Sequence, residues 1–213
     1  MTTSGRPDAF RRLGVRPSKA REVAGNTFLL ETPAIPVVDV YTGPLHDGLD
    51  FARLSKPAAA RAAQGLVVTS ALWGALRPSD RIPPYRLSIH AALVGIDRID
   101  ATWRAVLPDA LAEAGGDGLI VDLRSTYYQA AGLPAGRTDR TVALKVEQGP
   151  HHHIGDVVAK RVRGEAAHHL LESGAEPNDP DALAEVLADR WPVRLEPPER
   201  RGNPWLLTLN VNA

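Results

Sequence analysis

The sequence predicts a single α/β domain with a central mixed sheet flanked by helices. Short apolar runs typical of buried strands alternate along the chain with stretches in which apolar residues recur at helical spacing. No linker or internal repeat interrupts this alternation, and 213 residues are enough to bury one full core. We therefore expect a frayed, polar segment over residues 1–12 and one compact domain over residues 13–213.

Each predicted strand is a run of β-branched or other apolar residues that ends at turn-forming residues. The strands expected from this pattern cover residues 36–42, 65–70, 119–123, 141–146, 193–196 and 205–211, and the last two are expected to pair. Residues 13–28 are expected to form a hairpin that enters a helix, with Pro17 at an early helical position. Further helices are expected over residues 49–54, 57–63, 101–114, 157–172 and 180–190.

The composition excludes several classes of function. The 25 basic and 25 acidic residues cancel, so an anion site must arise from local clustering of charge. There is no cysteine, which excludes disulfides and a thiol nucleophile. No apolar run approaches the roughly 18 residues of a membrane span, and the N-terminus lacks the apolar core of a signal peptide, so we expect a cytoplasmic protein. The only methionine is Met1, which suits an oxidative-stress role, although an Ala-, Arg- and Pro-rich coding bias would give the same composition.

An arginine-rich loop follows the predicted strand at 65–70. Three prolines stiffen it, so its charged groups and Tyr85 should be held in few conformations. Residues 71–87 closely resemble a motif of the YaaA family, the bacterial peroxide stress proteins. Three further motifs resemble that family in the same order, namely Val40-Tyr-Thr-Gly43, Val121-Asp-Leu-Arg-Ser-Thr-Tyr-Tyr128 and Ala159-Lys-Arg-Val-Arg-Gly164. The resemblance extends from about Leu13 to the C-terminus, and it implies a compact YaaA-like fold and a part in the peroxide stress response.

The chain departs from the family pattern at its start. Family members usually open with a hydrophobic strand and a Pro-Ser-x-x-Lys-type loop, whereas Pro17-Ser-Lys19 has no such strand before it. We expect either that this opening segment is lost or that the start of the sequence is mis-assigned. A missing strand would expose a sheet edge, which favours a homo-oligomer or a partner that covers this edge.

Several polar residues that the resemblance marks follow predicted strands. If the strands that bear Tyr41, the Arg77 loop and Arg124 lie side by side, their following loops converge at one edge of the sheet. Arginine binds carboxylates and phosphates through its planar fork, so this edge predicts a pocket for an anionic ligand. The ligand-binding residues expected there are Tyr41, Thr42, Arg77, Asp80, Arg86, Arg124, Ser125 and Arg163.

Two interpretations of these residues remain open. In an enzyme, Tyr85, Tyr128 or Lys160 would move a proton, because neighbouring arginines would lower the pKa of a lysine or tyrosine. Alternatively, the arginines only tie loops together through buried ion pairs, with Arg77–Asp80 and Arg124–Asp122 as the candidates.

The segment 13–20 resembles half of a helix-hairpin-helix element, through which the family has been linked to DNA binding. Such hairpins present backbone N–H groups and a basic side chain to a phosphate without reading the base sequence. The DNA-binding residues expected are Arg16, Ser18 and Lys19, in a corner that Arg11, Arg12 and Arg21 also make basic. A capped surface turn is the alternative interpretation.

These observations lead to two functional hypotheses. The first is a cytoplasmic peroxide-stress protein that binds DNA non-specifically. The second is a small-molecule enzyme, such as a specialised biosynthetic member of the family, that binds an anionic nucleotide or carboxylate.

No metal or other cofactor is expected. Adjacent histidines such as those at 151–153 cannot all face one ion, and no metal-binding motif includes them. His168 and His169 lie on a predicted helix whose apolar face other residues already form.

Overall fold

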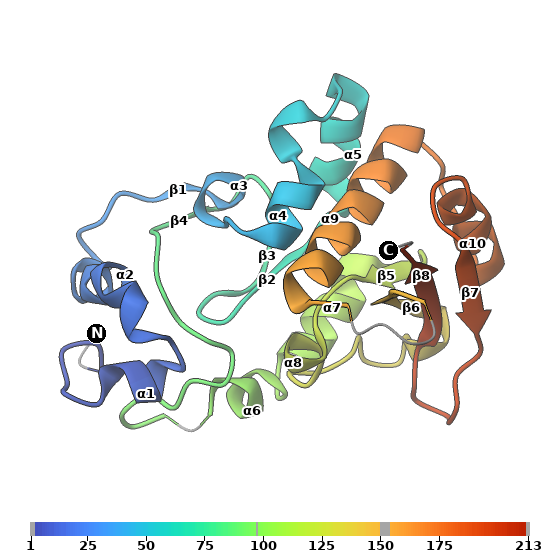
Figure 1. The fold of residues 1–213 in the computed structure, drawn as a ribbon. Helices are drawn as coiled ribbons and strands as arrows, with labels where there is room; N and C mark the ends of the chain where they lie inside the picture. The colour runs from blue at the N-terminus through green and yellow to red at the C-terminus, as the bar shows by residue number, and fades with distance from the viewer. Residues whose placement is uncertain (1–2, 97, 150–153, 212–213) are drawn as a thin grey trace. The chain divides into compact units, whose positions relative to one another are not determined.

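The computed structural model describes residues 3–96, 98–149 and 154–211. These residues fall into two compact units. Unit 1 comprises Met1–Val40, Val67–Leu111 and Thr126–Leu133, and unit 2 comprises Tyr41–Leu66, Ala112–Ser125 and Pro134–Ala213. Helices and strands are interleaved along the chain, and one sheet is mixed, so the predicted α/β class is confirmed (Figure 1). The single domain over residues 13–213 stays a prediction.

Unit 2 is built on a four-stranded sheet with the order β5-β6-β8-β7. Strands β5 (Ile120–Asp122), β6 (Thr141–Glu147) and β8 (Trp205–Asn210) are parallel, and β7 (Val193–Glu196) runs antiparallel to β8. The predicted strands at 119–123 and 141–146 and the closing pair are therefore confirmed, with small differences at their ends. The reason is that each carries enough apolar residues to bury at least one face.

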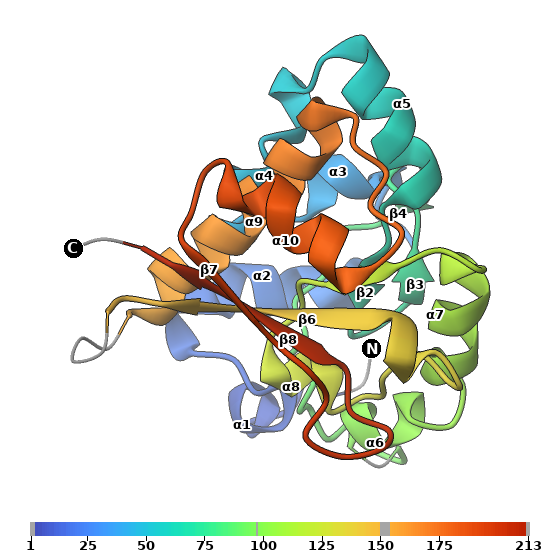
Figure 2. The ribbon, with the colours of Figure 1, turned by 90° about the vertical axis from the view of Figure 1, so that its right-hand side faces the viewer.

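The core of unit 2 lies between this sheet and two helices, α9 (Asp156–Ser173) and α10 (Pro180–Ala188), which lie on the same side of it (Figure 2). Alternate residues of β6 point to one face, as the period of a strand requires. The core is formed by Val142, Leu144 and Val146 of β6, Leu207 and Leu209 of β8, Val162 and Ala166 of α9, and Leu183 and Leu187 of α10. The helices expected at 157–172 and 180–190 are confirmed.

Two more helices of unit 2, α4 (Pro44–Leu49) and α5 (Lys56–Gly65), pack against α9. Arg61 of α5 donates through Nε and Nη2 to the carbonyl oxygen of Leu171, at 2.8 and 2.6 Å. Helix α5 confirms the expectation at 57–63. The helix expected at 49–54 is replaced by α4 and a short 3-10 turn, η3 (Phe51–Arg53), because Asp50 between them has a left-handed φ of 43°. A second such turn, η4 (Thr138–Arg140), precedes β6.

Unit 1 holds two short antiparallel ribbons and several short helices around a second core. Leu13, Val23, Ile89 and Leu107 are among the buried residues of this core. The elements, in chain order, are α1 (Ala9–Leu13), η1 (Pro17–Lys19), α2 (Ala20–Gly25), η2 (Asn26–Phe28), β1 (Ile35–Pro36), α3 (Val37–Val40), β2 (Val68–Ser70), β3 (Gly74–Leu76), β4 (Arg81–Ile82), α6 (Ile99–Trp103) and α8 (Thr126–Gln129). Helix α7 (Leu107–Gly115) continues from unit 1 into unit 2. Among the described residues, no helix is both long and apolar enough to cross a bilayer.

Two predicted elements of unit 1 are wrong. The strand expected over 36–42 is only β1: the amide of Val37 still donates to the carbonyl oxygen of Asp80 at 2.8 Å, next to the β1–β4 pairs, and the chain then continues as α3. The helix expected over 101–114 is two helices, α6 and α7. Pro108 has no N–H to give to the preceding turn, so the first helix ends before it. In the segment 1–12, α1 begins at Ala9, which is buried.

Candidate functional site

The hairpin of unit 1 lies between helices α1 and α2. Helix α1 ends in a Schellman motif. The amide of Gly14 donates to the carbonyl oxygen of Arg11 at 3.3 Å, and the amide of Val15 donates to the carbonyl oxygen of Phe10 at 3.0 Å. Gly14 has a φ of 63°, at which a residue with a side chain would be strained. A Cβ added there would also lie 2.9 Å from Cβ of Ser88. Leu13, which is fully buried, anchors the hairpin from one side, and Val23 of α2 anchors it from the other.

The outer side of this hairpin is basic. Residues 9–25 hold five basic residues and one acidic residue, a net charge of +4 in a chain whose net charge is zero. Arg16 and Ser18 are exposed, and the side chain of Lys19 is 43% exposed and paired with Glu22 at 2.7 Å. An exposed pair of this kind contributes little stability, so a phosphate can replace Glu22 as the partner of Lys19 at little cost. The charge and the backbone geometry therefore suit contact with a polyanion.

The arginine-rich loop of unit 1 is held in place by hydrogen bonds to its backbone. Asp80 accepts from the amide of Arg77 at 2.8 Å, and its own amide donates to the carbonyl oxygen of Arg77 at 3.1 Å. Asn26, which is fully buried, both donates to the carbonyl oxygen and accepts from the amide of Arg86, each at 2.8 Å. These bonds hold the backbone of the loop in place, as its prolines predict. The side chain of Arg86 forms an ion pair with Glu22, with 3.6 Å between Nε and Oε2.

The two tyrosines proposed for proton transfer are partly buried and pack against the core of unit 1. The hydroxyls of Tyr85 and Ser70 lie 2.7 Å apart. Burial is the main cause that raises the pKa of Tyr128, and nearby Tyr85 raises it further, against a smaller opposing effect of Arg86. The pKa of Tyr128 is therefore raised and not lowered as expected, because desolvation of the phenolate outweighs the effect of the Arg86 charge. Catalytic roles for Tyr85, Tyr128 and Lys160 stay predictions.

A second group of charged residues lies in unit 2, at the carboxyl end of β5. Arg124 binds the buried carboxylate of Asp122 in a two-point fork, with Nε at 2.9 Å and Nη2 at 2.8 Å. The two side chains are 12% and 3% exposed. This is the buried ion pair that the sequence offered as an alternative to a ligand site. Ser125 follows this pair directly in the chain.

Helix α9 adds two basic residues to the same unit. Lys160 pairs with Asp156 at 2.5 Å along the helix surface. Arg163 is only 8% exposed and donates to the carbonyl oxygens of Ala159 at 3.3 Å and Leu123 at 3.2 Å. Burial lowers the pKa of Arg163, against the opposing charges of Asp156 and Asp122.

Replacing Arg124 with methionine is expected to lower the free energy of unfolding by about 3–5 kcal/mol, because the carboxylate of Asp122 would stay buried without its charged partner. Urea denaturation of the variant measures this loss. The double variant Arg124→Met/Asp122→Asn should recover most of it, since it removes the unpaired charge. A double variant no more stable than Arg124→Met would contradict this account of the pair.

Tyr41 and Thr42 lie in unit 2, directly before helix α4. The ring of Tyr41 stacks on that of His46, with 5.5 Å between the ring centroids, whereas Thr42 is exposed. Burial lowers the pKa of His46, and the nearby charge of Asp47 opposes this shift. The folded chain therefore favours the neutral imidazole.

The stability of the chain should fall in acid through His46. Because its pKa is lower in the folded than in the unfolded chain, its contribution is fully present above the unfolded pKa of about 6.5 and is lost as the pH falls through the folded pKa. We expect the free energy of unfolding to drop more for the wild type than for His46→Gln between about pH 7.5 and pH 5. Equal drops in the two proteins would show that His46 does not titrate on unfolding.

The expected pocket residues are divided between the two units. Arg77, Asp80, Tyr85, Arg86 and Tyr128 lie in unit 1, and Tyr41, Thr42, Arg124, Ser125, Lys160 and Arg163 lie in unit 2. The condition that their strands lie side by side in one sheet is not met among the described strands. Strand β3, before Arg77, pairs with β2, whereas β5, before Arg124, belongs to the four-stranded sheet, and Tyr41 follows helix α3. A pocket formed by all of these residues stays a prediction.

The histidines on helix α9 bind backbone carbonyl oxygens. Nδ1 of His168 lies 2.7 Å from the oxygen of Leu49, and Nε2 of His169 lies 3.0 Å from that of Val186. The histidines at 151–153 lie outside the described residues. Within the described ranges, no group of three or more histidine and acidic side chains is placed to hold a metal ion.

Sequence reasoning missed one charged cluster of unit 1, formed by Arg98, Asp100 and Arg104. Asp100 is 1% exposed and accepts hydrogen bonds from both arginines. The Arg-x-Asp-x-x-x-Arg spacing was the available signal, since residues four apart share a helix face.

Comparisons with known proteins identify relatives that cover most of the chain. The family model described as peroxide stress protein YaaA matches residues 6–194. A UPF0246 protein of Streptomyces coelicolor is 42% identical over 202 residues, which cover 94% of this chain and 78% of the relative. A UPF0246 protein of Corynebacterium efficiens is 36% identical over 186 residues, which cover 84% of this chain and 72% of the relative. The chain therefore belongs to the family of the peroxide stress protein YaaA.

Proposed function

We propose that this protein binds the phosphate backbone of DNA through the hairpin between α1 and α2, without reading base sequence. The observation that carries the proposal is the hairpin itself, which ends helix α1 in a Schellman motif at Gly14 and exposes Arg16 and Ser18 within a segment, residues 9–25, whose net charge is +4. Arg16 and Lys19 supply charge to the phosphates, and Ser18 supplies a hydroxyl donor. The binding would serve the peroxide-stress role in the family's name.

Phosphate contacts of this kind give an affinity that depends on salt and hardly on sequence. Each phosphate that a basic side chain neutralises releases counterions from the DNA, so log Kobs falls by about 0.9 per unit of log salt for each contact. Because the net charge of the whole chain is zero, attraction to DNA depends on local clusters of basic residues such as the hairpin.

The proposal is tested by fluorescence anisotropy with two duplexes of equal length and unrelated sequence. We expect the same Kd for both, within about twofold, and no displacement by free mononucleotides. A protein that binds neither duplex at about 50 mM salt, or that mononucleotides displace readily, would refute DNA binding through the hairpin.

A second candidate function is the binding of a small anion in unit 2, and Arg163 favours it. This buried guanidinium donates to two neutral carbonyl oxygens, whereas the nearby carboxylates of Asp122 and Asp156 pair with Arg124 and Lys160. The five side chains together carry one positive charge near the carboxyl end of β5, where ligands of open α/β sheets collect.

Thermal melting with phosphate and with citrate tests this second candidate. An anion that raises the Tm of the wild type but not that of Arg163→Met supports the site. An equal rise in both proteins contradicts it.

A further inference from the structure

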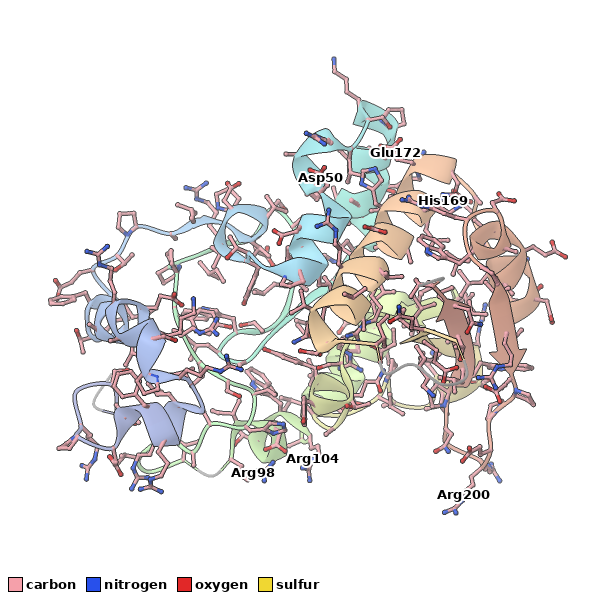
Figure 3. All side chains as sticks on the ribbon, in the orientation of Figure 1. Asp50, Arg98, Arg104, His169, Glu172 and Arg200 are labelled. Carbon is pink, nitrogen blue, oxygen red and sulfur yellow. The ribbon has the colours of Figure 1, made fainter. Side chains whose placement is uncertain are left out.

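A buried carboxylate in unit 1 holds two exposed arginines. Oδ1 of Asp100 accepts from Nε of Arg98 at 2.9 Å, and Oδ2 accepts from Nη2 of Arg98 at 2.9 Å and from Nη2 of Arg104 at 3.2 Å. The side chain of Asp100 is 2% exposed, whereas those of Arg98 and Arg104 are 59% and 56% exposed. Figure 3 shows the two arginines side by side at α6. We refer to these three residues as the Asp100 clamp.

The clamp fixes the orientation of both guanidinium groups. Arg98 makes a two-point fork with the carboxylate, which sets the plane of its guanidinium. Arg104 is held from a second side, because its Nε donates to the carbonyl oxygen of Ala130 at 2.9 Å. In both residues the hydrogen bonds to described parts of the chain involve Nε and Nη2, and Nη1 makes none of them, so the Nη1 edge is the one that a ligand would meet.

The clamp contains more positive charge than is needed to neutralise the carboxylate of Asp100. One arginine would neutralise the buried carboxylate, and the second leaves the three side chains with a net charge of +1. Nη2 of Arg98 also lies 3.2 Å from Nδ1 of His90. The same Nδ1 lies 3.8 Å from Oδ2 of Asp100.

The clamp is tied to the DNA-binding hairpin within the same unit. The amide of Ala92 donates to the carbonyl oxygen of Arg12 in α1 at 2.8 Å, and Ala92 forms a β-bridge with Arg98. The amide of Ser88 donates to the carbonyl oxygen of Leu13 at 3.0 Å, directly before Gly14. The backbone that carries the clamp is therefore held to the end of the helix that opens the hairpin.

We propose that the Asp100 clamp is a second phosphate-binding point of the same protein, where Arg98 and Arg104 bind a backbone phosphate of DNA held by the hairpin. The inference rests on the proposed function. A phosphodiester has two free oxygens, which two guanidinium groups of fixed orientation can bind together. Asp100 acts as a positioning residue, since it orients the arginines without contacting the DNA.

The effect of Asp100→Asn on DNA affinity shows whether Asp100 orients the two arginines or whether the DNA responds only to the net charge of the clamp. This change removes one negative charge, so an interaction that depends only on net charge would strengthen. If Asp100 positions the arginines, the affinity of the full chain for a short duplex should instead fall about threefold to tenfold. Unchanged or tighter binding by Asp100→Asn, with the wild-type Tm, would overturn the positioning role.

Arg98→Ala tests the contact itself and leaves Asp100 paired with Arg104. We expect its Kd to rise about fivefold and its salt slope to fall by about one. Arg98→Lys keeps the charge but cannot form the fork, so it should stay weaker than the wild type. Wild-type affinity in Arg98→Ala or in Arg98→Lys would overturn the proposal, even if Asp100→Asn failed to fold.

These outcomes are distinguishable from a failure of the proposed function. A wild-type protein that binds no duplex refutes both proposals. DNA binding that is lost in Arg16→Ala/Lys19→Ala but unchanged in Arg98→Ala refutes the clamp alone. A Tm that rises with inorganic phosphate in the wild type but not in Arg98→Ala, with equal DNA affinities, would assign the clamp to a free phosphate and overturn its role on DNA.

Discussion

Replacing Gly164 with alanine is expected to lower the free energy of unfolding by about 2–4 kcal/mol. Gly164 lies in the middle of helix α9, where glycine is normally unfavourable relative to alanine. Helix α4 explains its presence. A Cβ at this position would meet the carbonyl oxygen of Leu45, and it would lie 2.7 Å from the amide nitrogen of Leu49. These are backbone atoms, which cannot move aside as a flexible side chain can.

The same substitution at Gly65 is the matched control. Gly65 is the last residue of α5, and a Cβ there would meet nothing within 4 Å. Gly65→Ala should therefore leave stability unchanged or raise it by up to about 1 kcal/mol. Urea denaturation followed by circular dichroism measures both variants. Equal stabilities of Gly164→Ala and Gly65→Ala would show that α4 does not approach α9 as closely as described.

The double variant Arg16→Ala/Lys19→Ala is expected to bind duplex DNA about 10- to 100-fold more weakly than the wild type at low salt. It removes two charges from the exposed side of the hairpin. Neither side chain contributes to the core, since Arg16 is exposed and Lys19 makes an exposed pair with Glu22. The fold and the Tm should therefore be almost unchanged, and fluorescence anisotropy reports the loss of affinity directly.

A second double variant, Arg200→Ala/Arg201→Ala, controls for the loss of charge. Both arginines are exposed in the loop between β7 and β8 of unit 2, and Figure 3 shows Arg200 in this loop. The variant loses the same two charges from the whole chain as the hairpin variant. We expect its DNA affinity to stay within about twofold of the wild type. Comparable losses in the two double variants would mean that total charge, rather than the hairpin, governs binding.

The strands of unit 2 could be predicted from the sequence because their pattern is local. Val142, Leu144 and Val146 alternate along β6 with the period of a strand, and the structure places them in one core. The pattern Val-Val-Asp-Val-Tyr at 37–41 resembles a strand equally well. There the chain leaves its short pairing with β4 and continues as helix α3, and no local pattern reveals this change.

The candidate sites show the same division between local and distant determinants. Pro17 at the start of η1 and the glycine at 14 signal the hairpin in the sequence itself. The Arg124–Asp122 pair could also be offered, as the alternative to a ligand site, because the two residues are only two positions apart in the chain. The side-by-side strands on which the predicted pocket was conditional are not found among the described strands, because strand order depends on long-range pairing. The Asp100 clamp was missed, because nothing in the sequence shows that Asp100 is buried while both arginines stay exposed.

The measurement that tests the central claim most directly is the salt dependence of DNA binding by the wild type and by Arg16→Ala/Lys19→Ala. A plot of log Kobs against log salt concentration gives the number of phosphates that each protein neutralises. We predict a steep negative slope for the wild type and a slope smaller by about two in the variant. Equal slopes in the two proteins, or a wild-type affinity that does not change with salt, would contradict DNA binding through this hairpin.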